Sequence, residues 1–566
     1  MKRMISLLVA MTLAFSLLLT GCGKGDEKIA DAPERIAEES AQEAPLESES
    51  EDAVNDVIDL GEGDVSDDEV ISDEVEEESV PLLIPVSTRR MYDNEWCEDD
   101  PFVQYAGGIC DRVMLDHYIS GFYPELEAAI EEYTKAGYED YQKTYTKYLG
   151  YAKEDYSDDP DNFYGPYFAH YMYSVPRSDG KITCITRHAD LYSGGSHPDT
   201  VYRTTVFDSL SGKVLRLSDV CADYDGMRDI VSQTLDDKYG DYVSYFGKDE
   251  TLAKYFDGNH DVATEEEGAA DFTLGYYGIT FTFSPYEIAS FADGVLNVTI
   301  PYIGNEDLFT KDFSSSSEAF AIPFEANTNF EASFEDDAVF DSIYVAGSED
   351  YESGMMTRLD IYVNDDMYTD EDIFASKIEP VYIHTDDGRN YLYADVAEGD
   401  YHNLMVFEIS RDGIEYVGTD KLGFGGYVDE NDELCGTFVT DPYCFALETK
   451  LDTLGTTSGT KDYYVGDDGM PVSDDEEYDM YWPLYLTLKQ NLEVTRVDDD
   501  TLEEIDNVTC REGEMIVMFL TNGEDHVIGV DERGDLVKVE YGGDDYSPTI
   551  NGTDANEIFD GIMFAG

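Results

Sequence analysis

Two histidines and two aspartates lie close together in the chain, on either side of a glycine pair. His188 and Asp190 precede Gly194-Gly195, and His197 and Asp199 follow it. Histidine and aspartate at this spacing can ligate zinc or serve in acid–base catalysis. If the segment is a strand, His188 and Asp190 share a face. An enzyme site here is therefore one hypothesis. We prefer a structural, hydrogen-bonding role for His197, and we expect the two glycines to supply backbone angles that other residues cannot reach.

The other candidate motifs are incomplete. Ser193 and Ser196 lack the Gly-x-Ser-x-Gly elbow that presents a catalytic serine. Glu287 is a single carboxylate, whereas glycosidases need two at a set separation. The acidic residues at 158–162 lack the glycine and terminal glutamate of an EF-hand loop. No phosphate-binding glycine loop is present. We therefore predict no catalytic residue, no metal and no cofactor.

The N-terminus has the pattern of an export signal. Lys2 and Arg3 precede an apolar run from Ile5 to Leu19, which is too short for a membrane span. The run ends in Leu-Thr-Gly21-Cys22, which resembles the bacterial lipoprotein lipobox. The resemblance implies cleavage between Gly21 and Cys22 and acylation of the Cys22 thiol. We predict a protein held by lipid alone at the extracytoplasmic face of the cell membrane. The alternative is an ordinary secretory signal.

Composition limits the choice of partners. The chain of 566 residues has 126 acidic and 35 basic side chains, for a net charge of -91. So negative a body repels nucleic acid and anionic lipid head groups and attracts cationic partners. The hydrophobic content of 42% is enough for packed cores. Residues 47–78 are close to a polyacidic tract, which self-repels and stays extended.

Periodicity predicts an α+β fold followed by all-β regions. A helix is expected over 124–148 and another around Met227 to Leu235, with strands at 87–96, 168–175, 182–192, 201–207, 214–217 and 295–302. After residue 327 short strands alternate with Asp-Gly turns at 387–388 and 412–413. The predicted organisation is a signal peptide (1–22), an acidic disordered stalk (23–80), an α+β module (82–325), a β-rich domain (327–475), a small barrel (480–545) and a tail (546–566).

Seven cysteines remain besides Cys22, and an extracytoplasmic address permits disulfides. Proximity in sequence suggests the pairs Cys97–Cys110 and Cys435–Cys444, with Cys184–Cys221 as a further candidate and Cys510 left over. Connectivity does not follow from sequence. The alternative is that all seven are buried thiols.

Several phrases between residues 87 and 302 occur together in a known module. They are Tyr192–His197 (YSGGSH), Phe207-Asp208, Ser211-Gly212-Lys213, Leu217–Val220 (LSDV), Phe283–Ala289 (FSPYEIA) and Ile300-Pro301-Tyr302. This region resembles the extracytoplasmic domain shared by PdaC-type peptidoglycan deacetylases and RsiV-type lysozyme-sensing anti-sigma factors. The resemblance implies an antiparallel sheet with helices packed on one side. It also implies structural roles for the motif residues Gly194, Gly195, His197, Asp208, Gly212, Asp219, Pro285, Tyr286, Pro301 and Tyr302. By pattern, residues 480–545 resemble an SH3-type barrel.

The chain lacks the catalytic motifs of the deacetylase family. The deacetylases carry Thr-Phe-Asp-Asp-Gly and a His-x-x-x-His pair, whereas this chain has only Thr385–Gly388 (TDDG) and no such histidines. We therefore predict a non-enzymatic binding or sensor module for peptidoglycan or for a cationic wall-active protein such as lysozyme. The alternatives are an envelope polysaccharide hydrolase or deacetylase with a site near His188 and His197, and a structural envelope interaction protein.

Overall fold

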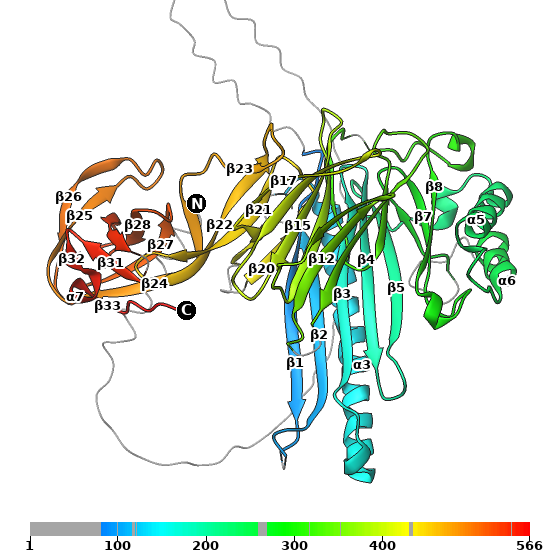
Figure 1. Ribbon diagram of the computed structural model, residues 1–566, viewed down its shortest axis with the longest axis horizontal. Coiled ribbons are helices and arrows are strands. Elements are labelled where there is room, and N and C mark those ends of the chain that lie inside the picture. The colour runs from blue at the N-terminus through cyan, green and yellow to red at the C-terminus, as the bar shows by residue number, and fades with distance from the viewer. Residues whose placement is uncertain are drawn as a thin grey trace, which may run out of the picture. The chain divides into compact units, whose positions relative to one another are not determined.

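A seven-stranded sheet and one long helix dominate the first part of the structure (Figure 1). This computed structural model describes residues 81–565, apart from 99, 116–118, 120, 259–268, 316, 351–352, 429–433 and 545. The signal peptide, Cys22 and the stalk therefore lie outside the described residues. The sheet order is β19-β20-β1-β2-β3-β4-β5. Its strands are β1 (Val86–Trp96), β2 (Gln104–Leu115), β3 (Tyr167–Ser178), β4 (Ile182–Tyr192), β5 (Asp199–Asp208), β19 (Gly426–Val428) and β20 (Leu434–Phe438).

Helix α3 (Pro124–Asp158) connects β2 to β3, which are parallel neighbours and so need a crossover. Pro124 stands in the first turn, where its missing N–H costs nothing. The helix runs ten residues beyond the predicted end at Tyr148. Its buried side recurs at helical spacing and packs on β2 and β3. A side chain at Gly137 would collide with the Tyr173 hydroxyl, so glycine sets how closely helix and sheet approach.

A smaller α+β layer follows and completes the predicted module. It pairs β6 (Phe272–Leu274), β7 (Gly278–Phe283) and β8 (Leu296–Pro301) with the helices α4 (Leu217–Val220), α5 (Tyr224–Tyr239) and α6 (Lys248–Ala253). Met227, Val231 and Leu235 of α5 share one core with Phe281 and Val298. The predicted strand at 214–217 is wrong, because Val214 makes only a single bridge to Phe207 and α4 begins at Leu217.

Two further sheets pack face to face. One has the order β17-β16-β15-β14-β9 and the other β10-β11-β12-β13. Their strands are β9 (Phe320–Pro323), β10 (Asn329–Ala332), β11 (Asp341–Glu349), β12 (Met356–Val363), β13 (Asp366–Asp370), β14 (Lys377–His384), β15 (Asn390–Ala397), β16 (Leu404–Ser410) and β17 (Gly413–Asp420). Both predicted Asp-Gly turns are confirmed, between β14 and β15 and between β16 and β17. Strand β15 is buried along its whole length.

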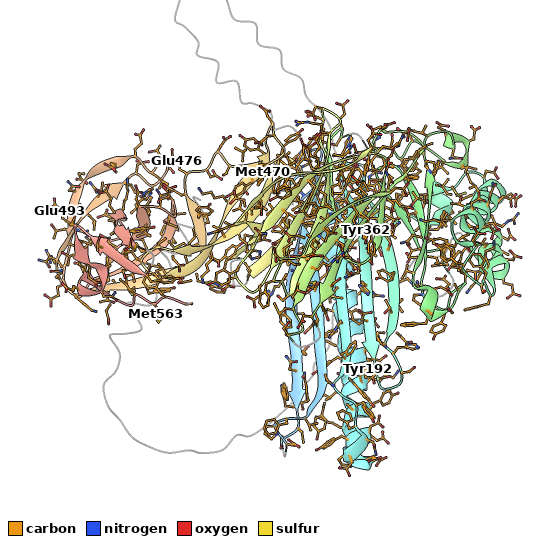
Figure 2. All side chains as sticks on the ribbon, viewed as in Figure 1. Tyr192, Tyr362, Met470, Glu476, Glu493 and Met563 are labelled. Atoms are coloured by element: carbon orange, nitrogen blue, oxygen red, sulfur yellow. The ribbon has the colours of Figure 1, made fainter. Side chains whose placement is uncertain are left out.

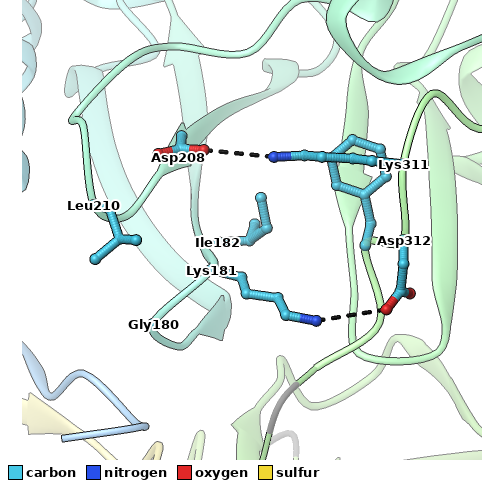
Figure 3. Close-up of a pocket in the computed structure, with 8 residues that line it drawn as sticks. Gly180, Lys181, Ile182, Asp208, Leu210, Lys311 and Asp312 are labelled. Carbon is cyan, nitrogen blue, oxygen red and sulfur yellow. Dashed lines mark ion pairs between the residues drawn. The ribbon is translucent and has the colours of Figure 1, made fainter. Parts of the chain in front are cut away.

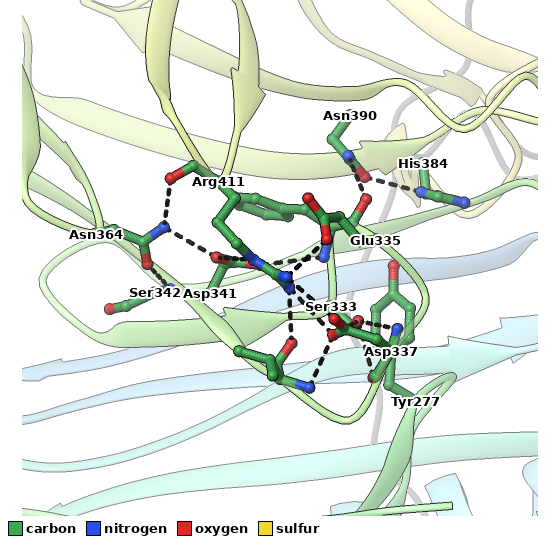
Figure 4. A network of polar contacts seen from close by, with 12 residues as sticks. Tyr277, Ser333, Glu335, Asp337, Asp341, Ser342, Asn364, His384, Asn390 and Arg411 are labelled. Atoms are coloured by element: carbon green, nitrogen blue, oxygen red, sulfur yellow. Dashed lines mark hydrogen bonds and ion pairs between the residues drawn. The ribbon is translucent and has the colours of Figure 1, made fainter. Parts of the chain in front are cut away.

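An arginine ties these two sheets together (Figure 4). Arg411 follows β16 and reaches the loop between β10 and β11, where its Nη1 lies 2.8 Å from Glu335 and 3.0 Å from Asp337. Its Nη2 lies 3.1 Å from Asp341 at the start of β11. One guanidinium thus lies against three carboxylates of a strongly anionic chain. The contacts favour a structural role for this acidic loop.

The last part of the chain forms one open sheet of eleven strands. Its order is β18-β21-β22-β24-β27-β28-β29-β25-β26, with β23 on β22 and β33 on β24. The strands are β18 (Gly423–Phe424), β21 (Phe445–Asp452), β22 (Thr456–Val465), β23 (Pro471–Val472), β24 (Tyr478–Leu488), β25 (Leu492–Val497), β26 (Glu504–Cys510), β27 (Met515–Thr521), β28 (His526–Val530), β29 (Leu536–Glu540) and β33 (Phe559–Asp560). Beside it lie β30 (Gly542–Asp544), β31 (Ser547–Ile550), β32 (Thr553–Asp554) and α7 (Ala555–Ile558).

This sheet corrects the predicted barrel over 480–545. Strand β24 pairs with β27 on one side and with β22 on the other, so the tail strands extend a sheet that starts before residue 430. No closed barrel is found among the described residues. Strand pairing also crosses the predicted boundary near residue 326, since β20 pairs with β1.

The predicted disulfides are likewise absent from the described part of the chain. The register of β1 and β2 sets Met91 opposite Cys110, six residues from Cys97, which is about 20 Å along a strand. A disulfide needs Cα atoms within about 7 Å. Cys110, Cys184 and Cys221 are buried free thiols, and burial raises the pKa of Cys184 to about 12. No disulfide joins Cys435 and Cys444 where the chain is described.

Candidate functional site

His188 is held between two carboxylates. Its Nδ1 lies 3.1 Å from Oε1 of Glu325, and its Nε2 lies 3.2 Å from Oδ1 of Asp190. The ring stacks on Tyr202 of β5, with centroids 4.4 Å apart. Burial opposes a charge on His188, but the two carboxylates outweigh it and raise the pKa to about 9. The two carboxylates thus favour the imidazolium form, and in that form the ring can neither take up a proton nor ligate a metal.

His197 has different partners and a different task. Its Nδ1 lies 2.9 Å from the carbonyl oxygen of Pro198, and its Nε2 lies 3.1 Å from the hydroxyl of Tyr286. The ring stacks on Phe291 at 3.9 Å. His197 thereby fastens the β4–β5 turn to the segment after β7. No cluster of three or more metal-ligating side chains occurs in the described ranges.

Two motif glycines occupy backbone conformations that other residues rarely adopt. Gly212 has a φ of +63°, and a side chain there would run into the carbonyl of Glu125 at the start of α3. Gly194 has a φ of +94°, and a Cβ atom would lie 2.6 Å from the Tyr167 hydroxyl. Both positions serve turn geometry and close packing.

The remaining motif residues also serve turns and packing. Asp208 accepts hydrogen bonds from the backbone and hydroxyl of Ser211, and Asp219 accepts from the Arg216 backbone and from Lys213. The Tyr302 hydroxyl donates to the carbonyl of Gly275 at 3.1 Å. Tyr286, after Pro285, has a φ of +69°, and Pro301 ends β8 opposite Gly278.

Asp208 also lines a small cavity of about 130 Å³ (Figure 3). Two lysines and two aspartates alternate around it, with Lys181 3.6 Å from Asp312 and Lys311 3.6 Å from Asp208. Ile182 and Phe313 form its apolar wall. Because each ammonium group faces a carboxylate, the hollow is largely self-neutralised.

A different set of residues gathers at one end of the seven-stranded sheet. The β1–β2 turn, the α3–β3 connection and the β4–β5 turn meet there, since β2 and β3 are parallel and begin side by side. Tyr192 marks this end in Figure 2. Three large rings there are solvent-exposed: Trp96 at 51%, Phe102 at 93% and Tyr164 at 76%. We call these three residues the distal rim.

The rim is supported by packed aromatic rings. Tyr105 contacts Tyr156 with centroids 5.4 Å apart, and Tyr156 contacts Phe163 at 5.6 Å. Phe163 in turn contacts Tyr167 at 5.5 Å. The exposed rings therefore stand beside an ordered base that joins the hairpin, the helix and the sheet. Such pre-organisation lowers the entropic cost of binding.

The rim is also strongly anionic. The segments 91–111, 154–176 and 188–202, which meet at this end, contain no lysine or arginine. Lys153, just before the second segment, is paired with Glu95 at 2.8 Å. The same three segments carry many carboxylates, including those of Glu98, Asp100, Asp158, Asp159 and Asp161. A ligand that suits this surface presents positive charge and flat or apolar groups.

Sequence reasoning missed the rim. Trp96, Phe102 and Tyr164 belong to no motif, and their exposure depends on which strands begin and end together. The only local signal is that each stands near a turn residue, such as Pro101 or Gly165.

The fold and the contacts define an α+β protein built mostly from antiparallel sheets. The family model described as "Protein of unknown function (DUF3298)" matches residues 230–303, within the module predicted from the sequence. The matched residues include Pro285, Tyr286, Pro301 and Tyr302. No curated protein matches the chain.

Two solved structures are similar to part of the chain. A DUF3298 family member from Bacteroides fragilis is 17% identical, with a TM-score of 0.30, over 41% of this chain and 96% of its own. A DUF3298 family protein from Pseudomonas aeruginosa is 13% identical, with a TM-score of 0.29, over 42% of this chain and 100% of its own. Within the described ranges, no helix has both the length and the apolar character needed to cross a membrane.

Proposed function

We propose that this chain is a lipid-anchored extracytoplasmic protein that binds a cationic wall-active protein, such as lysozyme, without catalysing a reaction. The distal rim is the proposed contact surface. The observation that carries the proposal is the combination of exposed rings and carboxylates in segments free of lysine and arginine. The resemblance to lysozyme-sensing anti-sigma factors supplies a precedent for the ligand class.

The chemistry of the rim suits arginine and lysine side chains. A guanidinium over an aromatic ring contributes roughly 0.5–2 kcal/mol, and a carboxylate beside the ring adds a charge-assisted hydrogen bond. Exposed Trp, Tyr and Phe are also unfavourable in water and are typical of binding hot spots. The net charge of -91 steers a cationic partner toward the molecule and makes association sensitive to salt.

In this proposal the N-terminal segments hold the folded module near the outer face of the membrane. Acylated Cys22 holds the chain at the membrane, and the acidic stalk spaces the folded part from it. Labelled palmitate is expected to enter the protein and not its Cys22→Ser variant. Absence of label from the unaltered protein would overturn the anchoring part.

The binding part is tested by titrating lysozyme into the whole chain carrying Cys22→Ser. We expect binding that weakens at least tenfold between 50 and 300 mM salt, as charge-driven association requires. The rim variant W96S/F102S/Y164S is expected to lose at least tenfold in affinity. The control L210S/I303S/Y485S removes three large side chains that are also at least half exposed and lie elsewhere, and it is expected to bind normally. Equal loss in both variants, or no binding by the unaltered rim, contradicts the proposal.

The rival hydrolase or deacetylase would use His188 and His197. Each ring nitrogen of these residues lies within hydrogen-bond or ion-pair distance of a protein oxygen. Release of sugar or acetate from peptidoglycan that His188→Gln abolishes, in a variant that still folds, would favour the enzyme.

A further inference from the structure

The face of the seven-stranded sheet that is turned away from α3 has an unusual composition. Along β3, Tyr167, Ala169 and Tyr171 are buried on the helix side, whereas the alternating Phe168 and His170 are half-buried. A sheet face in contact with water usually carries polar residues. Here the face carries the large side chains of Tyr92, Ile109, Phe168, His170 and Tyr192. We call the surface formed by these five residues the open face.

Strand register aligns these side chains in two rows. In one row Asn94 lies opposite Gly107, which neighbours Phe168, and Phe168 lies opposite Tyr192. In the other row Tyr92 lies opposite Ile109, which neighbours His170, and His170 lies opposite Asp190. Neighbouring strands are about 4.8 Å apart, so each row runs across four strands, and in the first row Gly107 contributes no side chain.

The rings in the first row have fixed positions. Phe168 and Tyr192 have centroids 5.5 Å apart at an interplanar angle of 30°, and Phe168 stacks on His170 at 4.6 Å. The Tyr192 hydroxyl donates to the carbonyl of Gly195 at 3.1 Å, which holds the ring at the β4–β5 turn. Tyr92 is 66% exposed and lies at the other side of the strip.

Polar groups lie directly beside the rings. The Gln104 amide nitrogen donates to the Asn94 side-chain oxygen at 2.8 Å, and the same nitrogen lies next to Gly107. Asp190 accepts from the Thr200 hydroxyl at 2.6 Å. Two carboxamides and a hydroxyl therefore border a strip of aromatic rings, and each retains further hydrogen-bonding capacity.

We propose that the open face binds a glycan of neutral or amino-substituted sugars. The inference rests on the proposed location at the cell wall, but it adds a second ligand that the rim does not explain. The apolar faces of sugar rings suit flat aromatic side chains, and sugar hydroxyls suit carboxamide and imidazole groups.

The charge of the chain narrows the glycan class. A polymer of uronic acids or phosphates is repelled by a protein of net charge -91, whereas neutral and amino sugars are not. A guanidinium on this face, that of Arg90, is already paired with Asp111 at 2.7 Å. Anionic lipid surfaces are disfavoured for the same reason.

The test uses the whole chain with Cys22→Ser and three soluble probes: a hexamer of N-acetylglucosamine, its de-acetylated form and an oligogalacturonate. We expect the first two to bind and the third not to bind. Tyr92→Ser and Tyr192→Ser are each expected to weaken binding at least fivefold, and Tyr192→Phe is expected to keep the stacking and most of the affinity. Tyr92 is exposed, so its variant is expected to fold.

The outcomes separate this inference from the proposed function. Glycan binding that survives W96S/F102S/Y164S supports the open face, whether or not lysozyme binds. If neither aminosugar oligomer binds, the proposal for the open face is overturned. Glycan affinity that is unchanged in Tyr92→Ser and Tyr192→Ser also overturns the proposal. So does a result in which these variants lose affinity for lysozyme or for neutral lipid vesicles but keep their affinity for glycan.

Discussion

The two ends of the seven-stranded sheet differ in what surrounds them. At one end β3 reaches Arg177, which is fully buried, pairs with Asp179 at 2.8 Å and donates to the carbonyls of Gly275 and Phe313. At the other end the same strand begins at Tyr167, beside the exposed distal rim. One end is held by contacts from distant parts of the chain, and the other faces solvent. We conclude that the buried charge in this sheet is structural, whereas the exposed rings are the surface that we propose for binding.

Arg177→Met should produce the largest effect. It leaves the Asp179 carboxylate buried without its partner, which typically costs about 3–5 kcal/mol of unfolding free energy. Urea unfolding followed by circular dichroism measures it. The double variant Arg177→Met/Asp179→Asn should recover part of the loss. A cost below about 1 kcal/mol for the single variant would show that the buried end is not held as described.

His188 lies between the two ends and should make stability depend on pH. Its pKa of about 9 in the folded protein exceeds the unfolded value of about 6.5. Its contribution is therefore full below pH 6.5 and is lost as pH rises through about 9. We expect the unaltered protein to lose on the order of 3 kcal/mol more than the His188→Gln variant between about pH 6 and pH 10. Parallel pH curves for the two proteins would contradict this.

Two glycines allow the packed end and the exposed end to be compared directly. Gly212 docks the end of β5 against α3, and an alanine there would clash with the Glu125 carbonyl. Gly195 lies at the rim end with a φ of +122°, and a Cβ atom added there would have no neighbour within 4 Å. We expect Gly212→Ala to cost about 3 kcal/mol and Gly195→Ala about 1 kcal/mol, because only the former adds a collision to backbone strain. Equal melting temperatures would be inconsistent with this packing.

The rim variant W96S/F102S/Y164S should have the smallest effect on folding. Exposed side chains usually change stability by no more than about 0.5 kcal/mol each. We expect its urea midpoint to match that of L210S/I303S/Y485S. A much lower midpoint would show that the rim rings support the fold and are not free for a ligand.

Local patterns in the sequence predicted the local elements. The helix from Pro124 and the strands near 168–175 and 182–192 are confirmed. In each of them the hydrophobic pattern repeats several times, over two or more helical turns or over two or more pairs of strand residues. Strand β2 was not predicted, since Gly107-Gly108 reads as a break. The structure explains that glycine pair, because a side chain at Gly108 would collide with Tyr141 of α3.

The pairing of strands that are distant in sequence could not be predicted from the sequence. Nothing near Val86 indicates that β1 pairs with β20, and nothing near Tyr478 indicates that β24 joins two sets of strands. The same limit applies to the site. His188 and His197 are neighbours in sequence yet contact different partners, whereas Phe102 and Tyr164 are distant in sequence yet lie at one end of the sheet.

Amide hydrogen exchange of the whole chain, with and without lysozyme, is the decisive experiment for binding at the distal rim. We expect lysozyme to slow exchange in the β1–β2 turn, residues 97–104, and in the α3–β3 connection, residues 159–166, with little change in β25 to β29. Protection confined to the C-terminal sheet, or no protection anywhere at saturating lysozyme, would contradict binding at the rim.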